Sequence, residues 1–330
     1  MKKYNVAIVG ATGLVGSTFL RVLQEKNLPI AKIYLYASRK SAGRTLKVFG
    51  KDERVLLLDE RNIKNKKIDF ALFSAGGTVS KNFATVFVKY GAVVIDNSSA
   101  FRQDLDVPLV VPQVNKDKIF SHNGIIANPN CSTIQCMAPL KVIDDLFKIK
   151  KINYTTFQAV SGSGIKGIDD FEKTAKGIKP SFYPYPIYNN VLCHIGDFNE
   201  NGYTQEEIKM VNESIKILGL KDVEISATCC RVPILNSHSV SISVECEREI
   251  DLEKTRENLS NFDSIKLVDD TKNLVYPLPL DATGTDFVYV GRTRVDLFNK
   301  KVIHLFTVAD NIRKGAASNA VEIMEELMKK

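Results

Sequence analysis

A cysteine stands where a turn leads into an apolar helical pattern, in the segment Asn128-Pro-Asn-Cys131-Ser-Thr-Ile-Gln. A strand is expected to end at Ala127 and a helix to begin near Ser132 or Thr133. A helix N-terminus lowers the pKa of a thiol and favours the nucleophilic thiolate, and its free N–H groups can hold an oxyanion. Because such a cysteine is more often a small packed residue, the segment alone only nominates Cys131 as a nucleophile.

The other five cysteines give no sign of a metal or redox motif. No pair has C-x-x-C spacing, which argues against a zinc ribbon and against a thioredoxin motif. Cys136 lies one helical turn after Cys131 and is expected in the core. Pro139 predicts that this helix is kinked or restarts there. No metal is expected.

Three glycines at residues 10, 13 and 16 form a second chemical pattern, Gly10-Ala-Thr-Gly13-Leu-Val-Gly16. They follow an apolar strand pattern and precede a helical one. Glycines there permit a tight turn and a close approach of pyrophosphate to backbone N–H groups at a helix N-terminus. The spacing is G-x-x-G-x-x-G, so the alternative is a tight turn without a ligand.

The end of the next expected strand bears on the type of nucleotide. An NAD site usually has an acid there for the ribose 2′-hydroxyl. This chain instead reads Ala37-Ser-Arg-Lys-Ser-Ala-Gly43, with two cations and no acid. The segment favours the 2′-phosphate of NADP(H), and the alternative is a solvated basic loop.

The first 130 residues alternate between strand and helix patterns. Such alternation predicts a doubly wound, Rossmann-like parallel sheet of the α/β class. Helical spacing covers residues 17–26 and 80–90. Short apolar runs predict strands at residues 5–10, 32–37, 69–74, 91–96, 107–111 and 124–127.

The second half predicts an α+β domain with an open, mostly antiparallel sheet. Its strands alternate more and have long connections; they are expected at residues 152–160, 223–230, 239–246, 287–295 and 302–308. A long helix is expected over 202–218, with Glu206, Glu207, Lys209 and Glu213 on its polar side. A last helix is expected over 316–329.

The length and charge fit this two-domain interpretation. A chain of 330 residues with 44% hydrophobic and 25% charged residues suits two globular domains. No apolar run reaches the roughly 18 residues of a membrane span, and no signal-peptide pattern is present, so a cytoplasmic protein is expected. The net charge of +7 is spread over many lysines, which favours small anions over nucleic acid as partners.

Seven ordered segments, which span essentially the whole chain, resemble the signatures of the aspartate-semialdehyde dehydrogenase family. The resemblance implies reversible, NADPH-dependent reduction of L-4-aspartyl phosphate to L-aspartate 4-semialdehyde with release of phosphate. This reaction belongs to the biosynthesis of diaminopimelate, lysine, threonine and methionine. The segments are residues 10–16, 97–102, 128–135, 157–164, 206–209, 231–238 and 310–317.

The resemblance assigns the covalent chemistry to three residues. Cys131 attacks the acyl phosphate and forms a thioester, which divides one difficult displacement into two easier ones. His238, one of four histidines, is the acid–base group. Gln158 orients the acyl group.

The resemblance also assigns the substrate-binding roles. Arg231 grips the α-carboxylate, for which a guanidinium fork is well suited. Glu206 pairs with the amino group. Lys209 lies on the same side of the helix as Glu206 and binds phosphate with Arg102. Without the resemblance, Glu206 and Lys209 would be interpreted as a solvated surface ion pair.

The implied NADP-binding domain comprises residues 1–129 and 312–330, and the implied catalytic and dimerisation domain residues 130–311. The family forms homodimers or dimers of dimers. The implied cofactor contacts are Gly10, Thr12, Gly13, Leu14, Val15, Ser38, Arg39, Lys40, Ser41, Ser161, Gly162 and Asn311.

Three alternatives share part of this pattern. The substrate of an N-acetyl-γ-glutamyl-phosphate reductase has a neutral, acylated amine, for which the acid Glu206 has little purpose. The nucleophile segment of such a reductase usually reads Asn-Pro-Gly-Cys-Tyr. A glyceraldehyde-phosphate dehydrogenase shares the thioester chemistry, but its flanking segments differ. A non-catalytic NADP-sensing protein would keep the glycine turn and not need Cys131.

Overall fold

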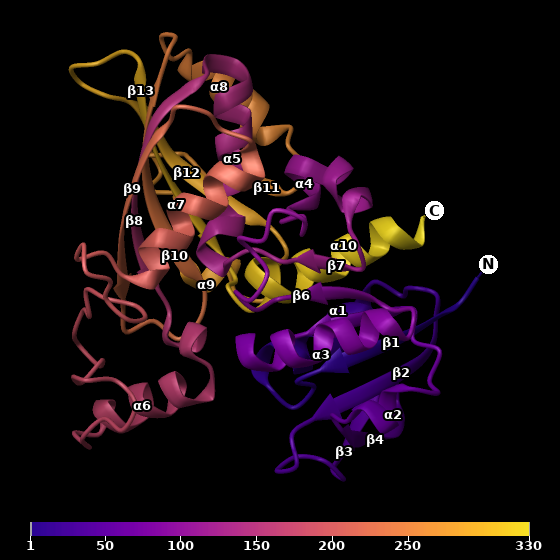
Figure 1. Ribbon diagram of the computed structural model, residues 1–330. Coiled ribbons are helices and arrows are strands. Elements are labelled where there is room, and N and C mark those ends of the chain that lie inside the picture. Colours follow the sequence, from indigo (N-terminus) through magenta and orange to yellow (C-terminus); the bar gives the residue numbers. More distant parts are fainter. Residues whose placement is uncertain (1, 330) are drawn as a thin grey trace. The chain divides into compact units, whose positions relative to one another are not determined.

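The computed structural model describes residues 2–329, which form two compact units (Figure 1). One unit comprises the chain up to Pro129 together with the segment from Ala316 onward, and the other is Asn130–Gly315. The sequence predicts the return to the first domain at residue 312, and the first unit resumes at Ala316. Within residues 2–329, no helix combines the length and the apolar character that crossing a membrane requires.

The first unit is built on a seven-stranded sheet with the order β3-β4-β2-β1-β5-β6-β7. The strands pair in parallel, apart from the antiparallel β3–β4 hairpin. This confirms the predicted Rossmann-like sheet. The strands are β1 (Tyr4–Val9), β2 (Ile30–Ala37), β3 (Thr45–Val48), β4 (Lys51–Leu57), β5 (Phe70–Phe73), β6 (Val93–Asp96) and β7 (Ile125–Ala127).

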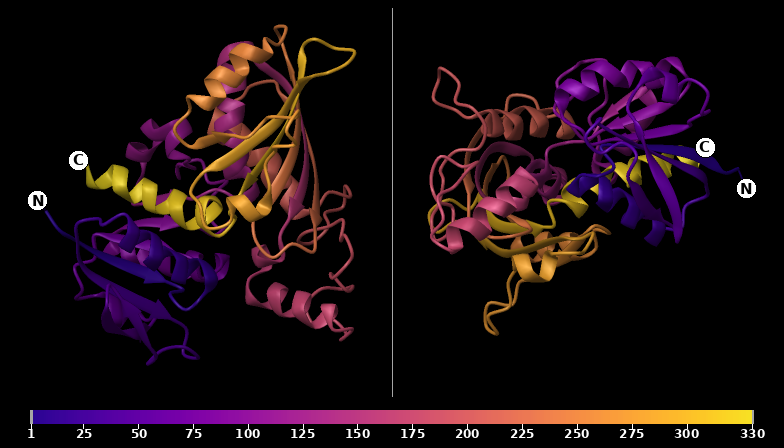
Figure 2. Two further views of the ribbon diagram at one scale, coloured as in Figure 1. Left: turned by 180° about the vertical axis from the view of Figure 1, so that it is seen from behind. Right: turned by 90° about the horizontal axis from the view of Figure 1, so that it is seen from below.

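Helices pack on both faces of this sheet because successive residues of a strand point to opposite sides. In β1, Val6 and Ile8 join the core under α1 (Leu14–Glu25) and α10 (Asn319–Met328), whereas Ala7 and Val9 join the core under α3 (Gly77–Lys89). Figure 2 shows α10, in yellow, beside the violet N-terminal strands. Shorter helices are α2 (Glu60–Ile63), α4 (Pro112–Asn115) and η1 (Lys116–Ser121).

Two parts of this sheet differ from the prediction. Residues 107–111 are not a strand, because their ladder is limited to one isolated bridge between Leu109 and Ala127. The β3–β4 hairpin was not predicted, because its strands are largely polar. Its two turn residues, Phe49 and Gly50, have φ angles of 49° and 78°, as a two-residue hairpin turn of type I′ requires.

The second unit contains a six-stranded sheet with the order β11-β12-β13-β10-β8-β9. Three pairings are antiparallel, and β8–β9 and β11–β12 are parallel, so the prediction of a mostly antiparallel sheet is confirmed. The strands are β8 (Ile149–Gln158), β9 (Glu224–Arg231), β10 (His238–Cys246), β11 (Ile265–Leu267), β12 (Val288–Val295) and β13 (Val302–Ala309).

The helices α5 (Cys131–Phe147), α7 (Gln205–Leu218) and α8 (Leu252–Ser260) pack against the strands on one side of this sheet (Figure 1). The sequence predicts that α5 is kinked or restarts at Pro139. The helix does not restart there, because it runs continuously through that residue. A proline there removes a single intrahelical hydrogen bond, and the helix is buried along most of its length. The remaining helices are α6 (Ile165–Ala175), α9 (Pro279–Ala282), the 3₁₀ segment η2 (Val160–Ser163) and the π-helical segment η3 (Arg313–Ser318).

Candidate active site

The candidate nucleophile Cys131 is the first residue of α5 and is half-buried. Asn130 caps the helix, since its Oδ1 accepts hydrogen bonds from the N–H groups of Ser132 at 2.8 Å and Thr133 at 3.4 Å. An asparagine at this position satisfies N–H groups that have no partner within the helix. The cap therefore fixes where the helix begins and holds the thiol at its N-terminus.

Helix α7 holds Asn130 in place through two glutamates. Glu213 accepts the backbone N–H of Asn130 at 2.6 Å, and Glu206 accepts its side-chain N–H at 2.8 Å. The acids that the sequence places on the polar side of this helix, Glu206, Glu207 and Glu213, are 5%, 7% and 0% exposed, so they lie in the interior of the unit. They are buried because each accepts hydrogen bonds inside the unit; Glu207 forms a capping box with Thr204.

Glu206 is the centre of a polar cluster. Its Oε1 also accepts from the Gln158 amide at 3.2 Å, and its Oε2 accepts from the Lys209 ammonium at 3.1 Å. Burial alone would raise the pKa of Glu206, but the Lys209 charge and the amide hydrogen bonds outweigh it and lower this pKa to about 2. The carboxylate is therefore ionised at neutral pH and already has three donors.

The ends of β8 and β9 bring two further candidate residues together. Gln158 and Arg231 close these strands as direct neighbours in the parallel ladder. The next residue, Ala159, anchors both functional side chains of this region: its carbonyl accepts from Arg231 Nη1 at 2.7 Å, and its N–H donates to His238 Nδ1 at 3.0 Å. Arg231 is only 5% exposed.

His238 opens β10 and is fully buried. Burial, followed by the Arg231 charge, lowers the pKa of His238 to about 3, so the ring is neutral near pH 7. Because Nδ1 accepts the Ala159 N–H, the neutral ring carries its proton on Nε2. Within residues 2–329, His238 Nε2 is buried with no hydrogen-bond partner, which leaves its proton for a ligand.

The residue before His238 has an unusual backbone. Ser237 has a φ of 71°, in the left-handed region. Its N–H donates to Asn311 Oδ1 at 2.9 Å, and its hydroxyl shares a hydrogen bond of 2.8 Å with Thr283. Asn311 is also bonded to Ser161, with its Nδ2 3.0 Å from the serine oxygen. Asn311 and Ser161 therefore fix the backbone at Ser237, directly before His238.

Two glycines leave room for the functional side chains. A Cβ on Gly162 would lie 2.7 Å from Arg231 Nη1 and 3.0 Å from His238 Nε2. A Cβ on Gly315 would lie 3.0 Å from Cys131 Cβ. The N–H of Gly315 donates to the Asp310 carbonyl, five residues earlier, at 2.9 Å, which is a π-type bond. The π-helical segment thus packs the backbone of Gly315 against the candidate nucleophile Cys131.

The glycine turn of the first unit borders a cavity of about 520 Å³. Gly10 has a φ of 87°, and a Cβ there would lie 2.2 Å from the Ser74 carbonyl oxygen; on Gly16 it would lie 2.1 Å from the Gly10 oxygen. Only glycine permits this close turn, and the cradle fits a dinucleotide. Residues at its wall include Gly10, Thr12, Gly13, Ser38, Arg39 and Asp59.

Four other predicted cofactor residues of the first unit are not among the residues of this cavity wall. Leu14 is the first residue of α1 and Val15 the second. Lys40 is exposed and Ser41 half-buried, and neither is among the residues of the cavity wall. Asp59 escaped the sequence prediction because it follows β4, a strand that was not predicted.

Arg102 belongs to the first unit and Lys209 to the second. Arg102 is 7% exposed, and its guanidinium donates to the carbonyls of Asn128 and Asn97, both at 2.9 Å. Sequence reasoning missed Glu213, Ala159 and Gly315 as parts of the site. Each of these three residues contacts a site residue that is distant in the chain, and such a contact leaves no pattern in the sequence. The one local signal in this part of the site is Asn130, a capping residue directly before Cys131.

Comparison with known families and proteins agrees with this geometry. Residues 5–122 match the model of the semialdehyde dehydrogenase NAD binding domain, and residues 139–314 that of the semialdehyde dehydrogenase dimerisation domain. The aspartate-semialdehyde dehydrogenase of Aquifex aeolicus is 50% identical, over 99% of this chain and 98% of that protein. Its Campylobacter jejuni counterpart is 46% identical, over 98% and 97%.

The crystal structure of aspartate semialdehyde dehydrogenase II from Vibrio cholerae has a TM-score of 0.94 at 42% identity and covers 100% of this chain and 99% of its own. A structure of the same Vibrio cholerae enzyme complexed with ASA has the same score and coverage. The Candida albicans enzyme with NADP has a TM-score of 0.78 at 25% identity and covers 99% of both chains. With identity of this degree over its whole length, the chain belongs to the aspartate-semialdehyde dehydrogenase family.

Proposed function

We propose that this chain catalyses the reversible reduction of L-4-aspartyl phosphate to L-aspartate 4-semialdehyde, with release of phosphate, through a thioester on Cys131. The observation that carries the proposal is the capped N-terminus of α5, where Cys131 shares one compact unit with Arg231, His238 and Glu206. The 50% identical relative from Aquifex aeolicus supports the activity. The complex of the Vibrio cholerae enzyme with ASA supports the substrate.

The substrate is an amino acid, and the site offers one group for each of its charges. The Arg231 guanidinium receives the α-carboxylate in two parallel hydrogen bonds. The Glu206 carboxylate, whose pKa is about 2, receives the α-ammonium. This acid also separates the proposed substrate from an N-acetylated analogue, whose neutral amide has no positive charge for Glu206 to hold.

The covalent step begins at the sulfur of Cys131. The thiolate attacks the acyl carbon, the carbon–sulfur bond forms, and the bond to phosphate breaks, so that phosphate leaves with its electron pair. The positive end of the α5 dipole stabilises the thiolate, and Gln158 orients the acyl group. The first-turn N–H groups of Ser132 and Thr133 are already taken by the Asn130 cap. Lys209 binds the departing phosphate.

Bound NADPH supplies the hydride that reduces the thioester carbon. The neutral ring of His238 donates a hydrogen bond from Nε2–H to the acyl oxygen as that carbon becomes tetrahedral and its oxygen becomes negative. The aldehyde carbonyl forms again as the carbon–sulfur bond breaks, and the sulfur of Cys131 leaves as the thiolate.

Several features of the first unit support NADP(H) as the cofactor. The cavity beside the glycine turn contains Arg39 and Ser38 at the end of β2. A guanidinium there suits a 2′-phosphate. The acid of the same cavity, Asp59, already accepts hydrogen bonds from the Arg61 side chain and from the N–H of Arg61. The Candida albicans structure contains NADP.

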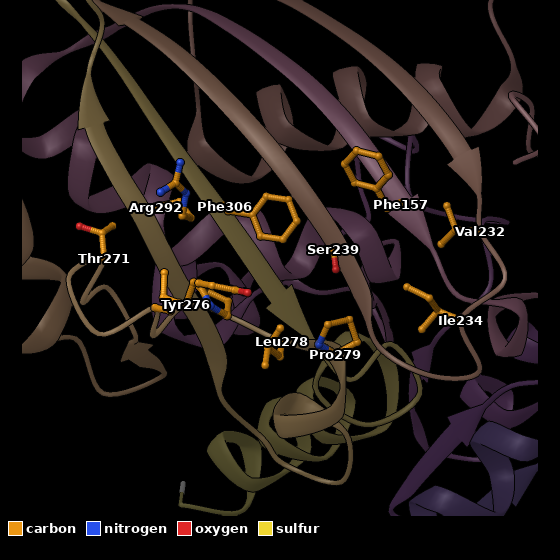
Figure 3. A pocket seen from close by; sticks show the side chains of 12 residues that line it. Phe157, Val232, Ile234, Ser239, Thr271, Tyr276, Leu278, Pro279, Arg292 and Phe306 are labelled. Atoms are coloured by element: carbon orange, nitrogen blue, oxygen red, sulfur yellow. The ribbon is translucent and has the colours of Figure 1, made fainter.

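An exposed apolar face supports a homodimer. The sheet side away from α5 and α7 carries a cavity of about 590 Å³. Figure 3 shows Phe157, Phe306, Val232, Ile234 and Leu278 around it. Nearby, Leu280 is 88% exposed. Apolar patches of this kind mark protein interfaces, and the matched family model describes a dimerisation domain. Light scattering on the purified protein is expected to give twice the chain mass.

One assay tests the activity. Purified protein with aspartate semialdehyde, phosphate and NADP⁺ is expected to produce NADPH absorbance, and Cys131→Ala is expected to abolish it. Cys136→Ala is a matched control, because this buried thiol lies in the same helix and has no role in the proposed chemistry. Turnover that persists in Cys131→Ala contradicts the nucleophile, and turnover with N-acetylglutamate semialdehyde instead supports the reductase alternative.

A further inference from the structure

Glu213 is a buried acid that the proposed chemistry does not use. It lies on α7 and is 0% exposed. Its carboxylate accepts the backbone N–H of Asn130 at 2.6 Å. Burying a carboxylate is unfavourable unless it gains strong hydrogen bonds, so its contact with the residue before the nucleophile requires an explanation.

Two acids of α7 accept hydrogen bonds from the same residue, Asn130. Glu206 and Glu213 are seven positions apart, which places them two turns apart on the same face of α7. Glu206 holds the side-chain amide of Asn130 at 2.8 Å, and Glu213 holds its backbone N–H. The Oδ1 of Asn130 is then directed to the N–H of Ser132 at 2.8 Å. The backbone and the side chain of the cap are thus fixed separately.

We propose that Glu213 is a positioning residue for the nucleophile: by holding the Asn130 backbone, it fixes the cap of α5 and the place of the Cys131 sulfur. The inference rests on the proposed role of Cys131. Glu213 acts through Asn130 and has no contact of its own with substrate in this scheme. A displacement of the helix start by about 1 Å is enough to change a rate by up to a hundredfold.

Two variants of Glu213 separate the effect of side-chain length from the effect of its charge, and a third variant is the control. Glu213→Asp keeps the carboxylate but withdraws it by one methylene, so the hydrogen bond to the Asn130 N–H is lost. Glu213→Gln keeps the length and one acceptor oxygen. Glu207→Asp is the matched control, because Glu207 is also a buried acid of α7 but accepts from the N–H groups of Thr204 and Cys229, which are not part of the cap.

The main readout is the reactivity of the thiol, which does not depend on any substrate. Each protein is treated with limiting iodoacetamide from about pH 6 to about pH 9, and alkylation is located by peptide mass. The exposed Cys193 serves as the reference within the same sample. In Glu213→Asp, alkylation of Cys131 relative to Cys193 is expected to change by at least about fivefold or to shift in pH, because the helix start moves.

Turnover supplies the second readout. In Glu213→Asp, kcat is expected to fall by about tenfold to a hundredfold while KM for aspartate semialdehyde changes by less than about threefold. Glu213→Gln is expected to recover most of this loss. In Glu207→Asp, thermal stability is expected to fall without a change in the alkylation profile of Cys131.

The outcomes distinguish this inference from the proposed function. If the Glu213→Asp profile and kcat match wild type, or if Glu207→Asp causes the same change, the positioning role is overturned. If Glu213→Asp does not fold, the alkylation profile of Cys131 in Glu213→Gln is compared with that of wild type instead. A profile like wild type supports the role of residue 213 as a hydrogen-bond acceptor for Asn130, and a displaced profile contradicts it. If wild-type protein has no turnover while Cys131 still responds to Glu213, the proposed function fails and the positioning role stands.

Discussion

Arg231 and His238 hydrogen-bond to opposite ends of the same residue, since the Ala159 carbonyl accepts from the guanidinium at 2.7 Å and the Ala159 N–H donates to the imidazole at 3.0 Å. The groups proposed to bind the substrate carboxylate and the acyl oxygen are therefore fixed to one short piece of backbone. Ala159 directly follows Gln158, which closes β8. A shift at the end of this strand would move both groups together.

Gly162 is expected to tolerate no side chain, because it lies against this pair. In Gly162→Ala, the added Cβ would approach Arg231 Nη1 to 2.7 Å and His238 Nε2 to 3.0 Å. We expect kcat/KM for aspartate semialdehyde to fall by at least about tenfold with little change in melting temperature. Steady-state kinetics and a thermal melt check this. Wild-type kinetics in the variant would mean that neither side chain needs its present place.

Gly315 is expected to be equally restricted beside the nucleophile. In Gly315→Ala, the new Cβ would lie 3.0 Å from Cys131 Cβ and 3.2 Å from the Cys131 carbonyl oxygen. We expect kcat to fall by about tenfold or more, because the thiol is pushed from its position. Turnover is measured together with iodoacetamide labelling of Cys131. A variant that labels and turns over like wild type contradicts the tight packing.

The cofactor preference can be tested at two neighbouring cations. Arg39 belongs to the wall of the cavity beside the glycine turn, whereas Lys40 is exposed and outside it. Loss of a charge-assisted hydrogen bond of about 1.5–3 kcal/mol corresponds to roughly a tenfold to hundredfold weaker affinity. We therefore expect Arg39→Ala to raise KM for NADP⁺ by that factor and to leave KM for NAD⁺ nearly unchanged.

Lys40→Ala is the matched control for that experiment and is expected to change KM for NADP⁺ by less than about threefold. Equal effects of the two substitutions would indicate a general attraction between a basic surface and the dinucleotide. An equal loss for NADP⁺ and NAD⁺ in Arg39→Ala would place the arginine at a part of the dinucleotide that both molecules share.

The buried His238 predicts a stability change with pH. Its pKa falls from 6.5 to about 3 in the folded protein, so below pH 6.5 the unfolded chain binds a proton that the native state does not. The contribution of this histidine is fully present above pH 6.5 and is lost as the pH falls toward 3. Within that window it decreases by at most about 1.4 kcal/mol per pH unit.

Urea unfolding followed by circular dichroism measures this effect at about pH 7.5 and about pH 5.5. In His238→Gln, which has no proton to bind in this range, the free energy of unfolding is expected to fall less on acidification than in wild type. Parallel curves for the two proteins would show that the wild-type imidazole titrates alike in the folded and unfolded states.

Much of the fold follows from patterns within the sequence. Continuous apolar runs, such as residues 6–9 of β1 and Phe70–Phe73 of β5, predict buried parallel strands because no polar residue interrupts them. The hairpin of β3 and β4 escaped prediction, since its stability comes from pairing to β2 and from the turn at residues 49–50. The helix predicted over α7 is confirmed, but periodicity does not reveal that its acids are buried, because their hydrogen-bond partners lie far along the chain.

The site divides in the same way. The asparagine before Cys131 is a local capping signal, and the glycine turn is a local backbone requirement. No spacing rule singles out Arg231 or His238, whose roles came from the family resemblance. Their common anchor at Ala159 depends on the register between β8 and β9 and on the start of β10, which the chain alone does not reveal.

Glu206 has a consequence for how the amino acid enters. Its two oxygens already accept from Asn130, Gln158 and Lys209, so an arriving ammonium that replaces the Lys209 ammonium leaves the acid fully paired. Binding is then an exchange of one positive or polar partner for another, and the acid is never left bare in a dry site. Under the roles proposed above, a lysine that gives up this contact becomes available to an anion at the same moment, which would link arrival of the amine to capture of the phosphate.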